Sequence, residues 1–136
     1  MIQGITIRGI GIDLVSLSEF DRLCRDTTSR FLDHHFTPAE IQYAERAAGR
    51  PVEHLAVRYA AKEALIKALD QTQLFRPARI GPVDYREIEV TRDPQGRPYF
   101  IFSGKLREMI ADLKVVTLVS LSHDGDYAVA QVVVTS

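Results

Sequence analysis

Two acidic side chains, far apart in the chain, have residue types and surroundings suited to binding a divalent metal. Asp13 stands in the apolar segment GIGIDLV, and Glu63 stands in RYAAKEALIKAL. A carboxylate among apolar neighbours is costly to bury unless it is paired or bound to a metal. Mg²⁺ takes oxygen ligands and commonly uses one or two protein carboxylates together with substrate phosphates. The pair therefore predicts a magnesium site, with capping of a strand end as the alternative for Asp13.

A basic residue follows Glu63 at helical spacing. Tyr59, Glu63 and Lys67 are four residues apart, so they share one helix face. A glutamate followed by lysine at this spacing also forms a simple salt bridge along the helix, and spacing alone favours that explanation. If Glu63 holds a metal, Lys67 would instead contact a phosphate bound to the same ion.

His123 ends the segment SLSH, directly before a turn. A lone histidine is more often structural than catalytic. Ser122 and His123 are adjacent in a predicted strand, so they point to opposite faces and do not form a hydrolase pair. The sequence has no G-x-S-x-G nucleophile motif, no phosphate-binding loop and no complete dinucleotide fingerprint. The pair His34-His35 is interpreted as a polar surface stretch.

Composition excludes several classes of protein. The chain has 136 residues, which fits one domain spanning 1–136, and its 17 basic and 18 acidic residues leave a net charge of -1. That balance argues against a nucleic-acid binder. No apolar run approaches the ~20 residues of a membrane span. Cys24 is the only cysteine, so there is no internal disulfide. The N-terminus does not read as a signal peptide, and we expect a cytoplasmic location.

The first half of the chain is predicted to be one strand followed by helices. Residues 5–15 are rich in β-branched side chains, and their glycines indicate a close backbone approach or a bulge. Ser16 or Ser18 is the expected N-cap of a helix. Thr37 and Glu40 form a capping box at the start of another helix, which should end near Gly49. The remaining predictions are a weak helix over 29–34, a strong helix over 52–69 and a loop over 70–84.

The second half is predicted to contain two hairpins separated by a helix. Pro94-Gln95-Gly96 and Asp124-Gly125 are the turn signals, and the helix begins at Ser103. We therefore expect an α+β fold in which an antiparallel sheet has the long helix packed on one face.

These segments, in this order, resemble the holo-[acyl-carrier-protein] synthase family of small stand-alone phosphopantetheinyl transferases. GIGIDLV is similar to the family's N-terminal G-x-D motif, RYAAKEALIKAL to its central F/W-x-x-K-E-A helix, and VSLSHDGDYAVAQVVV to its C-terminal serine-histidine hairpin. FTPAEIQYAE and RDPQGRPYF also resemble the family, so the similarity covers essentially the whole chain. It implies the 4'-phosphopantetheinyl transferase fold, and homotrimers with active sites between subunits.

The resemblance also implies a reaction. A serine hydroxyl of an apo acyl carrier protein attacks the β-phosphorus of coenzyme A, the 4'-phosphopantetheine group is transferred, and adenosine 3',5'-bisphosphate leaves. A metal-associated water or a carboxylate takes the serine proton. The rival reading is a non-catalytic module that binds coenzyme A or a nucleotide without turnover.

Site residues are implied in the same way. Asp13 and Glu63 match the ligands of Mg²⁺ and, with Lys67, are the expected catalytic residues. The residues that match the coenzyme A site are Arg58, Lys62, Lys67 and His123.

The chain departs from the family pattern on the surface that, in the family, contacts the acyl carrier protein. The family usually has a glutamate three residues after the aspartate and an arginine six residues after it, but this chain has Ser16 and Glu19. Arg22, Arg25 and Arg30 lie nearby and could supply positive charge instead. The departure leaves the identity of the carrier open, between a fatty-acid carrier and a specialised one such as a polyketide carrier.

Overall fold

The computed structural model describes residues 4–136. It confirms the predicted order of elements, with shifts of a few residues at their ends. The first half contains β1 (Ile7–Ser16), α1 (Leu17–Arg25), α2 (Phe31–His35), α3 (Pro38–Arg46) and α4 (Pro51–Gln71). The second half contains the 3-10 helix η1 (Tyr85–Glu87), β2 (Ile88–Arg92), β3 (Pro98–Phe102), α5 (Gly104–Leu113), β4 (Val116–Asp124) and β5 (Tyr127–Thr135). Within the described residues, none of these helices is both long and apolar enough to cross a bilayer.

Three strands form an antiparallel sheet in the order β1-β5-β4. The first strand pairs with the last one along its length, with Asp13 opposite Ala130. Side chains on β1 alternate: Ile10, Ile12 and Leu14 are exposed, whereas the residues between them face the interior. Because the period is two, Asp13 lies on the inner face of the sheet with the glycines.

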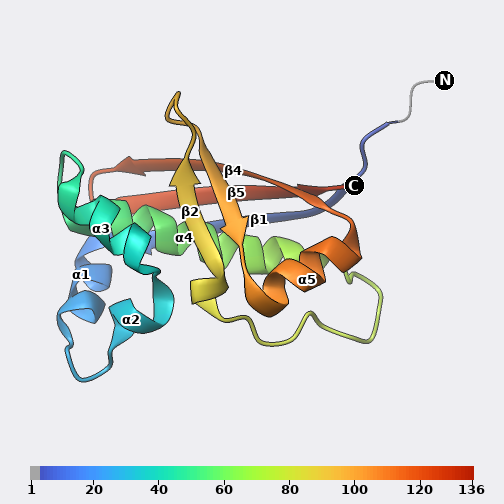
Figure 1. Ribbon diagram of the computed structural model, residues 1–136, viewed down its shortest axis with the longest axis horizontal. Helices are drawn as coiled ribbons and strands as arrows, with labels where there is room; N and C mark the ends of the chain where they lie inside the picture. Colours follow the sequence, from blue (N-terminus) through green and yellow to red (C-terminus); the bar gives the residue numbers. More distant parts are fainter. Residues whose placement is uncertain (1–3) are drawn as a thin grey trace.

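Helix α4 lies along the inner face of this sheet (Figure 1). A Cβ atom at Gly9 would overlap the carbonyl oxygen of Ala68, and one at Gly11 would overlap that of Ala64. The two glycines therefore let the helix backbone approach the strand backbone, as their sequence context predicted. A register shift between Ile7 and Gly9 adds the predicted irregularity.

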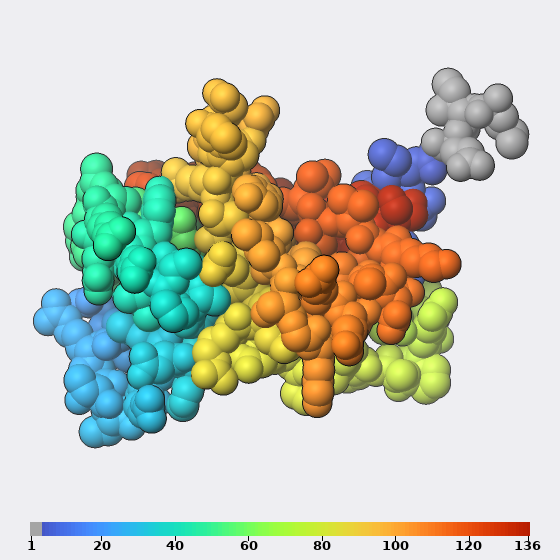
Figure 2. Space-filling view, viewed as in Figure 1, coloured from blue at the N-terminus to red at the C-terminus, as the bar shows by residue number. Residues whose placement is uncertain are grey.

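The hairpin of β2 and β3 forms a separate, two-stranded antiparallel sheet. Its side chains Ile88, Val90 and Phe100 join the core that α4 shares with β5. The hairpin thus covers α4 on the side away from the main sheet, and its turn protrudes from the surface (Figures 1 and 2). This placement brings the 3-10 helix η1 against the middle of α4.

Helices α1, α2 and α3 close one end of the molecule (Figure 1). Ser16 is the N-cap of α1, which settles the choice between the two serines. The capping box of Thr37 and Glu40 is present at the start of α3. Leu17 and Phe20 form the buried face of α1, whereas Leu23 is exposed.

Candidate active site

Asp13 and Glu63 face the same cavity, which has a volume of about 380 Å³. Asp13 stands on the inner face of strand β1, and Glu63 stands on helix α4, which packs against that strand. Tyr59 and Glu19 also line this cavity. The tertiary structure therefore brings together the two carboxylates that the sequence separates by fifty positions.

Lys67 pairs with the strand rather than with its own helix. Its Nζ lies 3.1 Å from Oδ1 of Asp13 and donates to the carbonyl oxygen of Ile12 at 2.9 Å. The interpretation of Glu63 and Lys67 as a simple helix salt bridge is therefore wrong. An ammonium has three N–H donors. Two are used here, and the third has no partner within residues 4–136.

The charges around Asp13 suit a cation. Burial, reinforced by the charge of Glu63, raises the pKa of Asp13, while the hydrogen bond and charge of Lys67 oppose the rise. Two carboxylates on one cavity offer oxygen ligands to a hard cation such as Mg²⁺, which fills its other positions with water and phosphate oxygens. Among the described residues no cluster of three or more histidine, cysteine or acidic side chains could hold a metal. Two protein carboxylates are a donor set that fits a metal whose other ligands are water and substrate phosphates.

A tyrosine from another element holds Glu63. The hydroxyl of Tyr85, on η1, donates to Oε1 of Glu63 at 2.6 Å. The rings of Tyr85 and Tyr59 are stacked, with centroids 6.1 Å apart. Burial raises the pKa of both phenols, and Glu63 adds to the rise, so both remain protonated donors.

Lys62 points into the interior, away from the cavity. Its side chain is 0% exposed. Its Nζ donates to the carbonyl oxygens of His35 and Tyr85 and to Oε1 of Glu40, at 2.6, 3.1 and 2.6 Å. These three bonds use all of its N–H donors. Lys62 therefore has a structural role in this molecule, and its contact with phosphates stays a prediction.

Arg58 is buried as well. Its guanidinium lies 4.3 Å from the centroid of the Tyr43 ring, and Nη1 donates to the carbonyl oxygen of His54. Burial lowers its pKa, although the neighbouring Tyr43 and Glu40 oppose the shift. Its Nε has no hydrogen-bond partner among the residues that the structure describes. The Arg58 side chain is therefore enclosed in this structure, and its contact with coenzyme A stays a prediction.

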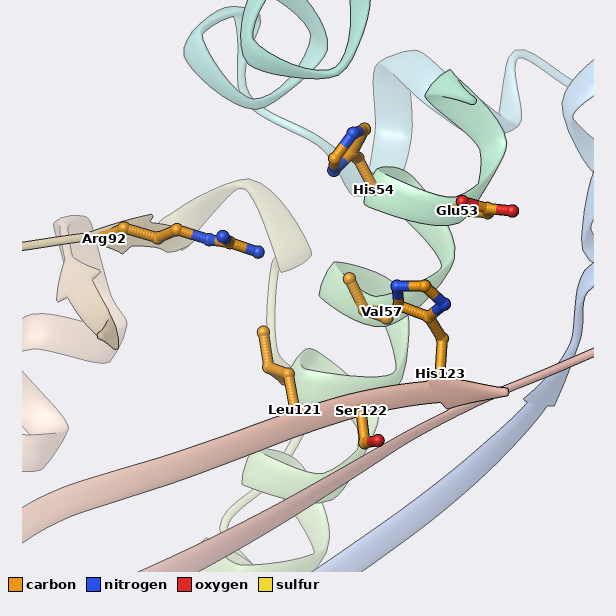
Figure 3. A pocket seen from close by; sticks show the side chains of 7 residues that line it. All are labelled: Glu53, His54, Val57, Arg92, Leu121, Ser122 and His123. Carbon is orange, nitrogen blue, oxygen red and sulfur yellow. The ribbon is translucent and has the colours of Figure 1, made fainter. Parts of the chain in front are cut away.

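His123 lies on a second cavity, of about 320 Å³, between the start of α4, the end of β2 and the end of β4. Figure 3 shows His123, His54 and Arg92 turned toward this space. These three side chains are all cationic or able to become so. Two imidazoles and a guanidinium offer N–H donors to an anionic group, while the carboxylate of Glu53 lines the same cavity. The contact of His123 with coenzyme A stays a prediction.

Comparison with known proteins identifies the family of this chain. Residues 9–132 match the family model described as the 4'-phosphopantetheinyl transferase superfamily. The chain is 40% identical to holo-[acyl-carrier-protein] synthase of Nocardia farcinica, over 95% of this chain and 88% of that protein. It is 41% identical to the enzyme of the same name from Geobacter sulfurreducens, over 93% and 96% of the two chains. The chain belongs to the 4'-phosphopantetheinyl transferase superfamily.

Solved structures of family members share its fold. A structure described as an ACPS–CoA complex of Chronobacterium ammoniagenes has a TM-score of 0.81 at 35% identity, with 97% of each chain covered. The holo-[acyl-carrier-protein] synthase of Neisseria meningitidis has a TM-score of 0.79 at 34% identity, covering 95% of this chain and 98% of that one. The α+β phosphopantetheinyl transferase fold predicted from the sequence is therefore confirmed.

Several residues in and beside these two cavities have no signal in the sequence. His35 was interpreted as surface, but it is half-buried and stacks on Phe31 with centroids 4.3 Å apart. Tyr85 and His54 stand outside the segments that resemble the family, and Arg92 is the first residue of RDPQGRPYF. Their contribution depends on contacts between distant elements, and only the aromatic and basic residue types themselves could have marked them as candidates.

Proposed function

We propose that this protein transfers the 4'-phosphopantetheine group of coenzyme A to a serine of an apo acyl carrier protein. The observation that carries the proposal is the shared cavity of Asp13 and Glu63 with Lys67 beside it, in a chain of this superfamily. Relatives named holo-[acyl-carrier-protein] synthase and a neighbour solved as a CoA complex support the choice of both substrates. The match over residues 9–132 supports treating 1–136 as one transferase domain.

The chain's own residues would act by position and charge. The carrier serine attacks the β-phosphorus, and adenosine 3',5'-bisphosphate leaves, so negative charge on the phosphoryl oxygens must be stabilised. The third N–H of Lys67, which has no acceptor within residues 4–136, could donate to such an oxygen. His123, with His54 and Arg92, would bind an anionic end of coenzyme A.

Asp13 and Glu63 are the residues that would hold Mg²⁺. When bound, the ion would supply charge neutralisation on the phosphate oxygens of coenzyme A. Lys67 would orient Asp13 through their 3.1 Å contact. Dependence on Mg²⁺ and the catalytic roles of these three side chains are parts of the proposal, as is a cytoplasmic location.

We further propose that copies of the chain associate through the outer face of the sheet. This surface would supply the subunit interface of the predicted homotrimer. This face carries exposed apolar side chains on both outer strands, between 49% and 63% exposed: Ile10, Ile12 and Leu14 on β1, and Val116 and Leu118 on β4. Apolar patches of this kind mark interaction surfaces in soluble proteins. Light scattering coupled to size-exclusion chromatography measures the assembly directly.

A carrier panel tests the transfer. The protein is incubated with coenzyme A, Mg²⁺ and apo carrier proteins of fatty-acid and polyketide type, and mass spectrometry detects the added arm. Modification of a carrier serine that stops when EDTA is added is the expected result. Folded protein that binds coenzyme A by calorimetry but modifies no carrier would instead favour the non-catalytic binding module.

A further inference from the structure

We propose that Tyr85 is a positioning residue that orients Glu63 for the metal. The inference rests on the proposed function of the Asp13–Glu63 cavity and adds a residue that lies outside its motifs. The Tyr85 hydroxyl donates to Oε1 of Glu63 at 2.6 Å, and the two residues lie 22 positions apart. A charge-assisted O–H···O⁻ hydrogen bond of this length is among the stronger ones in proteins.

The ring of Tyr85 is held from several sides. It stacks on Tyr59 with an interplanar angle of 14°, and the ring of His35 meets it edge-on at 4.7 Å between centroids. Its backbone carbonyl accepts from Nζ of Lys62 at 3.1 Å. The phenol is therefore fixed before any substrate arrives, so its hydrogen bond fixes the carboxylate of Glu63 in turn.

Lys62 and Glu63, adjacent residues of α4, therefore bind the two ends of Tyr85, its main chain and its hydroxyl. Lys62 binds its main chain inside the molecule, and Glu63 accepts from its hydroxyl at the cavity. A helix places side chains i and i+1 about 100° apart, so the two reach η1 by different routes. Through this arrangement the buried Lys62–Glu40 pair is coupled to the geometry of the site.

The hydrogen bond has a direct consequence for metal binding. The phenol occupies one side of Oε1, which leaves Oε2 and the remaining lone pairs of Glu63 for a cation. A carboxylate ligand that is held in one orientation loses less conformational freedom when it binds a metal. Removing partners that orient metal ligands commonly costs 10- to 100-fold in metal affinity or activity. Phenylalanine at position 85 would keep the ring contacts but could not donate.

The test measures metal affinity directly. Mn²⁺ is titrated into wild-type protein and Tyr85→Phe in the presence of coenzyme A, with free Mn²⁺ measured by electron paramagnetic resonance. We expect the variant to bind Mn²⁺ about 10- to 100-fold more weakly, while its affinity for coenzyme A without metal is unchanged. The matched control is Tyr99→Phe, which removes a hydroxyl from an exposed position on β3 and should bind Mn²⁺ like wild type.

A double-mutant cycle shows whether Tyr85 acts through Glu63. In a Glu63→Gln background, Tyr85→Phe should have little further effect on Mn²⁺ binding. Wild-type Mn²⁺ affinity in a folded Tyr85→Phe variant would overturn the inference, and so would an equal loss in both backgrounds. The carrier assay on the same wild-type sample is independent: wild-type protein that transfers no arm contradicts the proposed function, whatever the affinity of the variant.

Discussion

The ammonium of Lys62 lies 2.6 Å from a carboxylate oxygen of Glu40, with both side chains shut off from solvent. Glu40 also accepts from the backbone N–H groups of Thr37 and Val90, so it joins α3 to β2. The ammonium of Lys62 also donates to the carbonyl oxygens of His35 and Tyr85. The pair is satisfied by hydrogen bonds throughout, which is the condition under which a buried charge pair is tolerated.

Replacing Lys62 by methionine should therefore damage stability. The substitution leaves the Glu40 carboxylate buried and uncompensated, which typically costs about 3–5 kcal/mol. Urea denaturation followed by circular dichroism measures the loss. The control is Lys67→Met: that side chain is 54% exposed, so its loss should change stability by less than about 1 kcal/mol while transfer activity falls. Equal stability losses in the two variants would contradict this assignment of roles.

Glu63→Gln should abolish most transfer without unfolding the chain. The amide keeps the size of the side chain, and its oxygen can still accept from Tyr85, but the negative charge for the metal is lost. Metal stabilisation of a transition state is worth several kcal/mol, so we expect a fall of more than about 100-fold in rate at fixed Mg²⁺. The rate of carrier modification and the melting temperature are measured on the same sample. Retained activity would remove Glu63 from the site.

Glu19→Arg should favour acidic carrier proteins. Glu19 is exposed on the first turn of α1 and lines the same cavity as Asp13. Under the proposed function the carrier serine enters this cavity, so Glu19 would repel an acidic carrier there. Reversing its charge should raise kcat/KM for an acidic carrier by about tenfold at low ionic strength, with a smaller gain at high salt. The control is Glu45→Arg, which makes the same charge change on α3 and should leave the rate nearly unchanged. A similar gain from both variants would indicate a general charge effect.

Asp126→Asn should alter stability in a pH-dependent way. Asp126 accepts from the hydroxyls of Ser16 and Ser18 and from the Ser18 backbone N–H, so it ties the β4–β5 turn to the start of α1. These bonds, with the Ser18 hydroxyl first, hold the pKa of Asp126 below its ordinary 3.8. A lowered folded pKa gives stability that is present above pH 3.8 and disappears as the pH falls through the lower value.

Thermal unfolding between pH 7 and pH 3 checks this expectation. The Asn variant should melt below wild type at pH 7, and the difference should shrink as the pH drops under 3.8. Asp124→Asn, at the adjoining end of β4, serves as the control. A difference that is constant across the whole range would show that the charge of Asp126 is not responsible.

Local sequence signals determined much of this molecule. The capping box at Thr37, the turn residues of both hairpins and the alanine-rich period of α4 each act within a few positions of the chain. Such local interactions can be read from residue order. The sequence also identified the carboxylates of Asp13 and Glu63 as candidate site residues, because a buried acidic side chain among apolar neighbours requires a partner.

The tertiary structure alone decided which partners these side chains meet. Lys67 had an equally good partner four residues away, but the close approach that Gly9 and Gly11 allow brings Asp13 to it instead. Lys62 and Glu63 are neighbours in sequence, yet one is enclosed by three acceptors and the other faces the cavity. Hydrogen bonds and burial between distant segments depend on three-dimensional packing, which residue spacing along one helix cannot express.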